Sequence, residues 1–157
     1  MMIKKTIKKN KMKTEPFVIE RTYNAPVAKV WKAITDKDEM KLWYFDISEF
    51  KAEPGFEFQF VGTDPEGLKY LHLCKIIEVV AEKKLAYSWR YDGYSGNSLV
   101  TFELLEEGGK TRLRLTHKGL KTFPGDYAAF NKKNFAEGWT FIIGKSLKEF
   151  LEESNHQ

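Results

Sequence analysis

The chain has 157 residues, 42% of them hydrophobic and 15% aromatic, and a formal net charge of +4. This length suits one domain with a substantial core. Six of the 26 basic side chains lie within residues 1–13, which hold no acid, so elsewhere the 22 acidic side chains outnumber the basic ones. The domain itself therefore lacks the basic surplus typical of nucleic-acid binding, and no nucleic-acid partner is expected.

Residues 1–13 are predicted to be a basic, disordered arm that precedes one domain over residues 14–153. The arm resembles the charged start of a signal peptide, but no apolar segment follows it. No run in the chain is long enough to span a bilayer, so no membrane insertion is expected. Two alternatives stay open, namely initiation at Met12 and contact of the arm with nucleic acid or acidic lipid.

The single cysteine, Cys74, excludes an intrachain disulfide and fits a reducing, cytoplasmic setting. Cys74 lies in an alternating apolar segment, which predicts a small buried side chain. His72 would share its strand face, but a reactive thiol needs a partnered histidine or a positive surrounding.

In chain order, alternation predicts a first strand over residues 15–23. Asn24 is a candidate cap for a short helix over residues 26–35, and the proline at position 26 suits its first turn. Asp36 is a candidate cap for a second short helix over about residues 37–43. Two short helices therefore follow the first strand.

Further strands joined by tight turns come next. Their predicted ranges are residues 46–51 (a weak candidate), 56–60, 70–80, 85–91, 100–104 and 111–118. Short connections predict an antiparallel meander, and alternation gives it one charged and one apolar face.

The longest periodic stretch, residues 131–151, predicts one amphipathic helix, with Asp126 as a candidate cap. Gly138 and Gly144 within it each cost about 1 kcal/mol relative to alanine. This predicts close approach of the sheet or of a ligand, or a steric fit under a tryptophan, with bending near these points. The helix is expected to cover the apolar face, which gives an α+β fold of about six to seven strands.

Several short motifs keep a characteristic order and spacing. They occupy residues 24–27, 30–31, 41–43, 53–56, 85–89, 111–117, 119–120 and 138–151. Together they resemble the family named for the activator of the heat-shock-protein-90 ATPase, within the START and birch-pollen-allergen-like (SRPBCC) helix-grip superfamily. The resemblance implies a curved antiparallel sheet wrapped on a long C-terminal helix. It also implies an internal cavity, since members bind lipids, polyketides or other apolar molecules.

If the aromatic strand positions face inward, they and the helix stripe would line such a cavity. The predicted ligand-binding residues are Phe56, Phe58, Phe60, Tyr87, Trp89, Tyr91, His117, Phe135, Trp139 and Ile142. A filled aromatic core is the alternative, and the pattern without the resemblance favours it.

The expected function is binding of a small hydrophobic or aromatic ligand between the sheet and the C-terminal helix. One alternative is a chaperone-associated interaction module of the ATPase-activator kind, with a role in the stress response. Another is a cavity enzyme of cyclase or hydrolase type that uses His117, His72 or a tyrosine as acid or base.

No catalytic residue, cofactor or metal site is predicted. The histidines and the cysteine are scattered, and neither a phosphate-binding glycine loop nor a nucleophile elbow occurs. The sequence carries no pattern that sets the oligomeric state.

Overall fold

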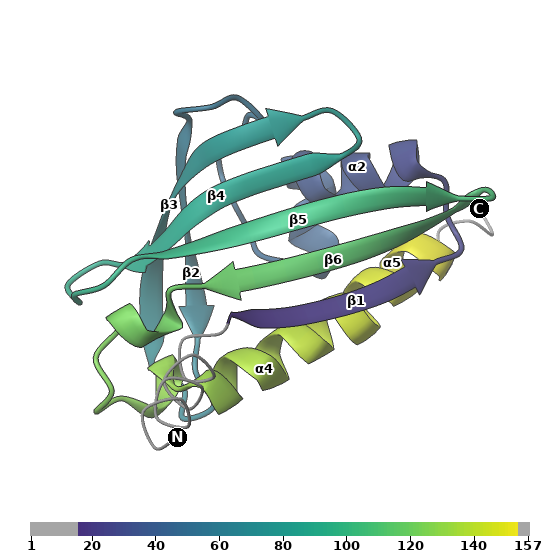
Figure 1. Cartoon of the computed structure of the whole chain (residues 1–157). Coiled ribbons are helices and arrows are strands. Elements are labelled where there is room, and N and C mark those ends of the chain that lie inside the picture. Colours follow the sequence, from purple (N-terminus) through teal and green to yellow (C-terminus); the bar gives the residue numbers. More distant parts are fainter. Residues whose placement is uncertain (1–15, 154–157) are drawn as a thin grey trace, which may run out of the picture.

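A computed structural model describes residues 16–153 of the chain. One curved antiparallel sheet of six strands, in the spatial order β1-β6-β5-β4-β3-β2, holds a long C-terminal helix across its open side (Figure 1). The strands are β1 (Phe17–Tyr23), β2 (Glu57–Thr63), β3 (Lys69–Val80), β4 (Lys84–Tyr91), β5 (Ser98–Glu107) and β6 (Lys110–Lys118). The helical segments are α2 (Val27–Thr35), α3 (Lys37–Trp43), η1 (Leu120–Thr122), η2 (Ala128–Phe130), α4 (Lys132–Phe141), η3 (Ile142–Ser146) and α5 (Leu147–Glu153). The predicted α+β helix-grip fold is confirmed, whereas the predicted basic arm lies outside the described residues.

The two short helices follow β1 as predicted, but only one has the predicted cap. Asp36 caps α3, because its Oδ2 accepts a hydrogen bond from the Glu39 backbone N–H at 3.3 Å. The prediction that Asn24 caps α2 is wrong, since α2 begins after Pro26 without a side-chain cap. The Asn24 N–H instead donates to Glu152 Oε2 at 3.0 Å, which connects the end of β1 with α5.

Two further expectations are wrong. Residues 46–51 form no strand, because this segment carries the chain from α3 to β2 and buries Ile47 without pairing. Five strands therefore follow α3 where about six were expected. Asp126 does not cap the long helix, whose cap lies five residues later: Asn131 Oδ1 accepts from the Asn134 N–H at 2.7 Å. Between β6 and this helix the chain buries Phe123, which follows η1, and Phe130 in η2.

The C-terminal helix contains a π-helical turn, η3, between α4 and α5. A π-helical turn shifts the backbone ladder and frees carbonyl groups. Tyr23 in β1 donates its hydroxyl hydrogen to the Ile143 carbonyl at 2.6 Å, so this part of the helix is fixed to the edge strand. Gly144 lies in the same turn, where an added Cβ would meet Arg21 at 3.5 Å. The predicted irregularity thus occurs at the second glycine, and Gly138 lies in regular α-helix.

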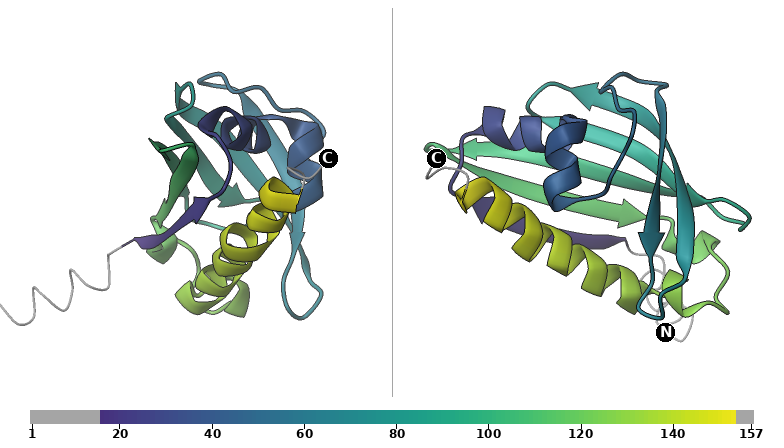
Figure 2. Two further views of the ribbon diagram at one scale, coloured as in Figure 1. Left: turned by 90° about the vertical axis from the view of Figure 1, so that its right-hand side faces the viewer. Right: turned by 180° about the vertical axis from the view of Figure 1, so that it is seen from behind.

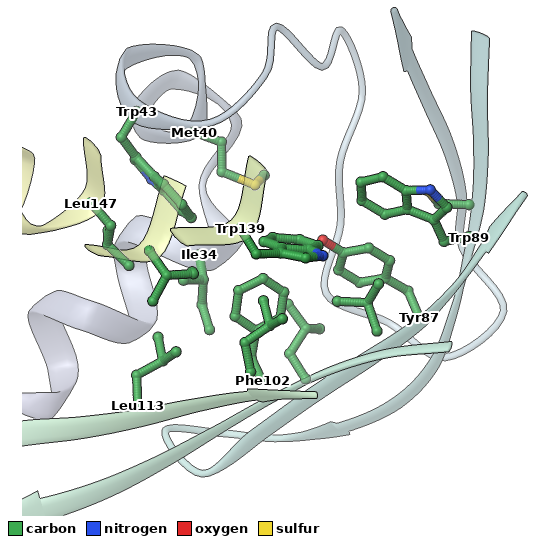
Figure 3. Packing of buried hydrophobic residues seen from close by; sticks show 14 of the residues in the cluster. Ile34, Met40, Trp43, Tyr87, Trp89, Phe102, Leu113, Trp139 and Leu147 are labelled. Carbon is green, nitrogen blue, oxygen red and sulfur yellow. The ribbon is translucent and has the colours of Figure 1, made fainter. Parts of the chain in front are cut away.

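One continuous apolar core fills the space between the sheet and the helices (Figure 3). Trp139 and Leu147 enter it from the long helix, while Ile34 and Trp43 enter from α2 and α3 (Figure 3). Trp43 also donates its indole N–H to the Ala33 carbonyl at 2.9 Å. Within residues 16–153, each buried side-chain nitrogen and oxygen has a hydrogen-bond partner, as expected for a well-packed interior.

Tyr23→Phe tests the bond that fixes the helix. The variant keeps the ring but leaves the buried Ile143 carbonyl without its partner, which should lower the free energy of unfolding by about 1–3 kcal/mol. Urea titration followed by circular dichroism measures this change. Tyr127→Phe is the matched control, because Tyr127 is 44% exposed and its loss should cost less than about 0.5 kcal/mol. Equal stability of the two variants would contradict this role for Tyr23.

Candidate functional site

A pocket of about 130 Å³ opens between α4 and the edge strand β2. The helix packs against β1 at the opposite edge of the sheet, and the β2–β3 hairpin stands on its other side (Figure 2, left). A twisted sheet diverges from a straight helix that is fixed at one edge, which leaves room at the other. The residues that line the pocket are Phe45, Gly62, Thr63, Asp64, Tyr70, His72, Trp89, Tyr91, Ala129, Asn134, Phe135, Gly138, Trp139 and Ile142.

Two glycines from opposite sides of the fold belong to this lining. An added Cβ at Gly138 in α4 would have no atom within 4 Å, so the missing side chain keeps the opening clear. An added Cβ at Gly62 in β2 would lie 2.6 Å from His72 Cε1. Glycine is thus required at position 62 because the His72 ring occupies the space beside it.

Aromatic rings form most of the pocket wall. The centroids of Trp89 and Trp139, one from the sheet and one from the helix, lie 5.5 Å apart. The His72 ring stacks on Phe60 at 4.5 Å and meets Tyr91 edge-on at 4.6 Å. Burial lowers the pKa of His72 to about 4, against the opposing effect of hydrogen bonds to the backbone of Tyr70 and Phe60. The His72 ring is therefore neutral at pH 7.

Among the lining residues, Tyr91 has a buried hydroxyl whose hydrogen has no acceptor within residues 16–153. The Trp89 indole N–H donates to the Tyr91 hydroxyl oxygen at 2.9 Å, so that oxygen already acts as an acceptor. For the Tyr91 O–H itself, no acceptor lies among residues 16–153. Burial raises the pKa of Tyr91, which keeps the hydroxyl protonated. Tyr91 can therefore donate one hydrogen bond to a molecule in the pocket.

A buried chain of hydrogen bonds holds both tryptophans in place behind this wall. The Trp139 indole N–H donates to His117 Nδ1 at 3.0 Å, which fixes the neutral ring with its hydrogen on Nε2. His117 Nε2 then donates to Ser98 Oγ at 2.8 Å, and the Ser98 hydroxyl donates to the Trp89 carbonyl at 2.7 Å. His117 is fully buried, and burial lowers its pKa to about 3. Both of its ring nitrogens are thus engaged, and its role here is to position the two tryptophans.

The structure divides the predicted site residues into two groups. Those that line the pocket are Trp89, Tyr91, Phe135, Trp139 and Ile142. Those that lie in the surrounding core are Phe56, Phe58, Phe60, Tyr87 and His117. In the core, Tyr87 and Tyr44 share a hydrogen bond of 2.6 Å between their hydroxyl oxygens, and burial raises both pKa values.

The remaining lining residues were not among the predicted site residues. Tyr70 and His72 alternate with Cys74 along β3, and this pattern could have placed them on the inner face. Asn134 and Gly138 precede Ile142 at four-residue steps and so share its helix face. Thr63 ends β2, and Asp64 comes from the following turn, which shows no periodic pattern.

Within residues 16–153, no cluster of three or more His, Cys, Asp or Glu side chains could hold a metal ion. No helix of this part of the chain has the length and apolar character needed to cross a membrane.

The sequence profile of the family described as Activator of Hsp90 ATPase homolog 1-like protein matches residues 24–152. No curated protein sequence matches the chain significantly.

Solved structures share the fold over most of the chain. A Chromobacterium violaceum protein is 20% identical with a TM-score of 0.74, covering 88% of this chain and 97% of its own. A Nitrosomonas europaea protein is 26% identical with a TM-score of 0.70, covering 92% and 98%. CalU16 from Micromonospora echinospora is 25% identical with a TM-score of 0.67, covering 90% and 78%.

Acid should destabilise the protein through its two buried histidines. The unfolded chain binds protons on both near pH 6.5, whereas in the folded protein the pKa values lie at about 4 for His72 and about 3 for His117. Their contribution to stability is complete above pH 6.5 and is lost as the pH falls to about 4 for His72 and to about 3 for His117. The free energy of unfolding should fall by at most about 1.4 kcal/mol per pH unit for each histidine.

Urea titrations at pH 7.5, 6.5 and 5.5 measure this slope. His72→Gln and His117→Gln each remove one titrating group. Each variant should therefore reduce the slope by up to about 1.4 kcal/mol per pH unit, whatever its stability at pH 7.5. Slopes identical to that of the unaltered protein would show that these histidines do not cause the acid sensitivity.

Proposed function

This chain belongs to the Activator of Hsp90 ATPase homolog 1-like family, and from that premise we propose that it binds a small apolar or aromatic molecule in the pocket between α4 and β2. The observation that carries the proposal is the coincidence of three properties at one place. The pocket is open, its walls are aromatic, and one of its lining residues, Tyr91, has a buried hydroxyl whose hydrogen has no acceptor within residues 16–153. Ligand sites are typically concave and mostly apolar, with a few placed polar groups.

The volume sets the size of what can be enclosed. A buried apolar cavity of roughly 150 Å³ can hold benzene, so the pocket of about 130 Å³ suits a single ring. The remainder of a larger molecule would extend through the opening beside Gly138, where no protein atom lies within 4 Å of an added Cβ.

The Tyr91 hydroxyl would orient the bound ligand. An acceptor oxygen on the bound ring, such as a carbonyl, would take the Tyr91 hydrogen and relieve a buried donor. We propose binding in preference to turnover, because His117 has both ring nitrogens engaged and so is poorly placed to exchange protons with a ligand.

The family description supports a second candidate, a module that binds the Hsp90 chaperone. Such binding would use the protein surface. Exposed apolar side chains occur on the strands at Val18, Val61, Ile77 and Leu105. Chaperone capture that persists when the pocket is blocked would support this candidate.

Gly138→Leu should block the pocket without unfolding the protein. The new side chain enters open space, and replacing a helical glycine should raise stability by up to about 1 kcal/mol. Ligand-observed NMR with acetophenone, a ring that carries one carbonyl, should show binding to the unaltered protein and none to the variant. Thr140→Leu on the same helix lies outside the pocket lining and should bind normally. Acetophenone binding that survives Gly138→Leu would place its site elsewhere.

Tyr91→Phe should weaken acetophenone binding about fivefold, the equivalent of one neutral hydrogen bond of about 1 kcal/mol. Ethylbenzene has no acceptor and serves as the matched ligand, so its affinity should change little. Competition NMR measures both dissociation constants. An equal loss for the two ligands would assign the effect of Tyr91 to packing and not to its hydroxyl.

A further inference from the structure

Within residues 16–153, the side chains that line the pocket carry negative formal charge and no positive formal charge. Among the described residues that line it, Asp64 carries a formal charge, and neither lysine nor arginine is present. His72, whose ring could carry a positive charge, is neutral at pH 7 because of its burial. The charge that a ligand meets in this pocket is therefore negative.

The fold holds the Asp64 carboxylate at a fixed place in the turn after β2. Its Oδ1 accepts the backbone N–H groups of Glu66 and Leu68, both at 2.9 Å. Its Oδ2 accepts the hydroxyl hydrogen of Tyr70 at 3.2 Å, and the Tyr70 ring also lines the pocket. These donors are neutral, and Asp64 takes part in none of the ion pairs between residues 16 and 153. No basic side chain of this part of the chain pairs with the carboxylate, so it can pair with a cationic ligand.

The aromatic rings around Asp64 also favour a cationic ligand. Aromatic faces carry negative charge density and attract cations, more strongly where water is partly excluded. Tyr70, Trp89 and Tyr91 are each less than 8% exposed and border the same space as Asp64. A cationic group would gain from the rings and the carboxylate together, whereas an anion would be repelled by both.

We propose that the pocket selects its ligand by charge, taking an aromatic ring that carries a protonated amine and rejecting the corresponding carboxylate. The ring lies against Trp89 and Trp139, and the ammonium group lies beside Asp64 and Tyr70. This inference rests on ligand binding in the same pocket, and it narrows the ligand class to arylalkylamines, among which those with an oxygen on the ring can also accept the Tyr91 hydrogen.

Three small molecules that share a phenyl ring test the selection: 2-phenylethylamine, 2-phenylethanol and phenylacetate. Their dissociation constants at pH 7 are measured by ligand-observed NMR with the full chain. The amine should bind about tenfold more tightly than the alcohol, and the carboxylate more weakly than either.

The variant Asp64→Asn tests whether the charge of Asp64 causes the preference for the amine. Asparagine keeps an oxygen for the two backbone N–H groups of the turn and removes the charge. In this variant the amine should lose most of its advantage over the alcohol, because only the attraction of the rings remains, while the affinity of the alcohol stays the same. Glu66→Gln is the matched control, since it removes a charge from the same turn at a position outside the pocket lining and should preserve the ranking.

The possible results separate the two levels of the inference. If none of the three molecules binds the unaltered protein, the proposed ligand binding itself is overturned. If the alcohol binds but the amine binds no more tightly, charge selection is overturned and ligand binding stands. An amine preference that Asp64→Asn leaves undiminished would also overturn the role assigned to Asp64.

Discussion

The hydrogen bond from the Tyr23 hydroxyl to the Ile143 carbonyl fixes the C-terminal helix to one edge of the sheet. The bonded carbonyl lies in the π-helical turn, where the helix passes β1. With the helix held at β1, the twist of the sheet separates it from β2 at the other edge. A β-bulge between Ile76 and Glu78 in β3 adds to the bending on that side. The pocket is thus a consequence of where the helix is attached.

A second constraint keeps the pocket wall in order. Trp139 belongs to the helix and Trp89 to the sheet, yet one buried chain of hydrogen bonds through His117 and Ser98 joins them. His117 and Ser98 each accept one hydrogen bond and donate another, so the polar groups of this hydrogen-bond chain are all paired. A wall built from two separate elements is in this way held as one unit. Such preorganisation reduces the entropy that a ligand would otherwise lose on binding.

The sequence predicted most of the fold, because alternation and helical periodicity are local properties. The second short helix, its Asp36 cap and the long amphipathic helix followed from spacing alone. The strand predicted at residues 46–51 was wrong, because this irregular segment buries Ile47 and alternation alone does not distinguish it from a strand. The extent of the pocket could not be predicted either. It depends on how far β2 stands from α4, and the turn that supplies Asp64 has no periodic pattern.

The two glycines at the opening, Gly138 and Gly62, differ in which substitutions they tolerate. At position 138 any side chain would point into unoccupied space, so the entrance can be narrowed by single substitutions that leave the backbone undisturbed. At position 62 even a methyl group would collide with the His72 ring, so this side of the entrance is nearly immutable. Substitutions at position 138 of the helix can therefore change which molecules enter the pocket, whereas position 62 on the sheet side is constrained to glycine.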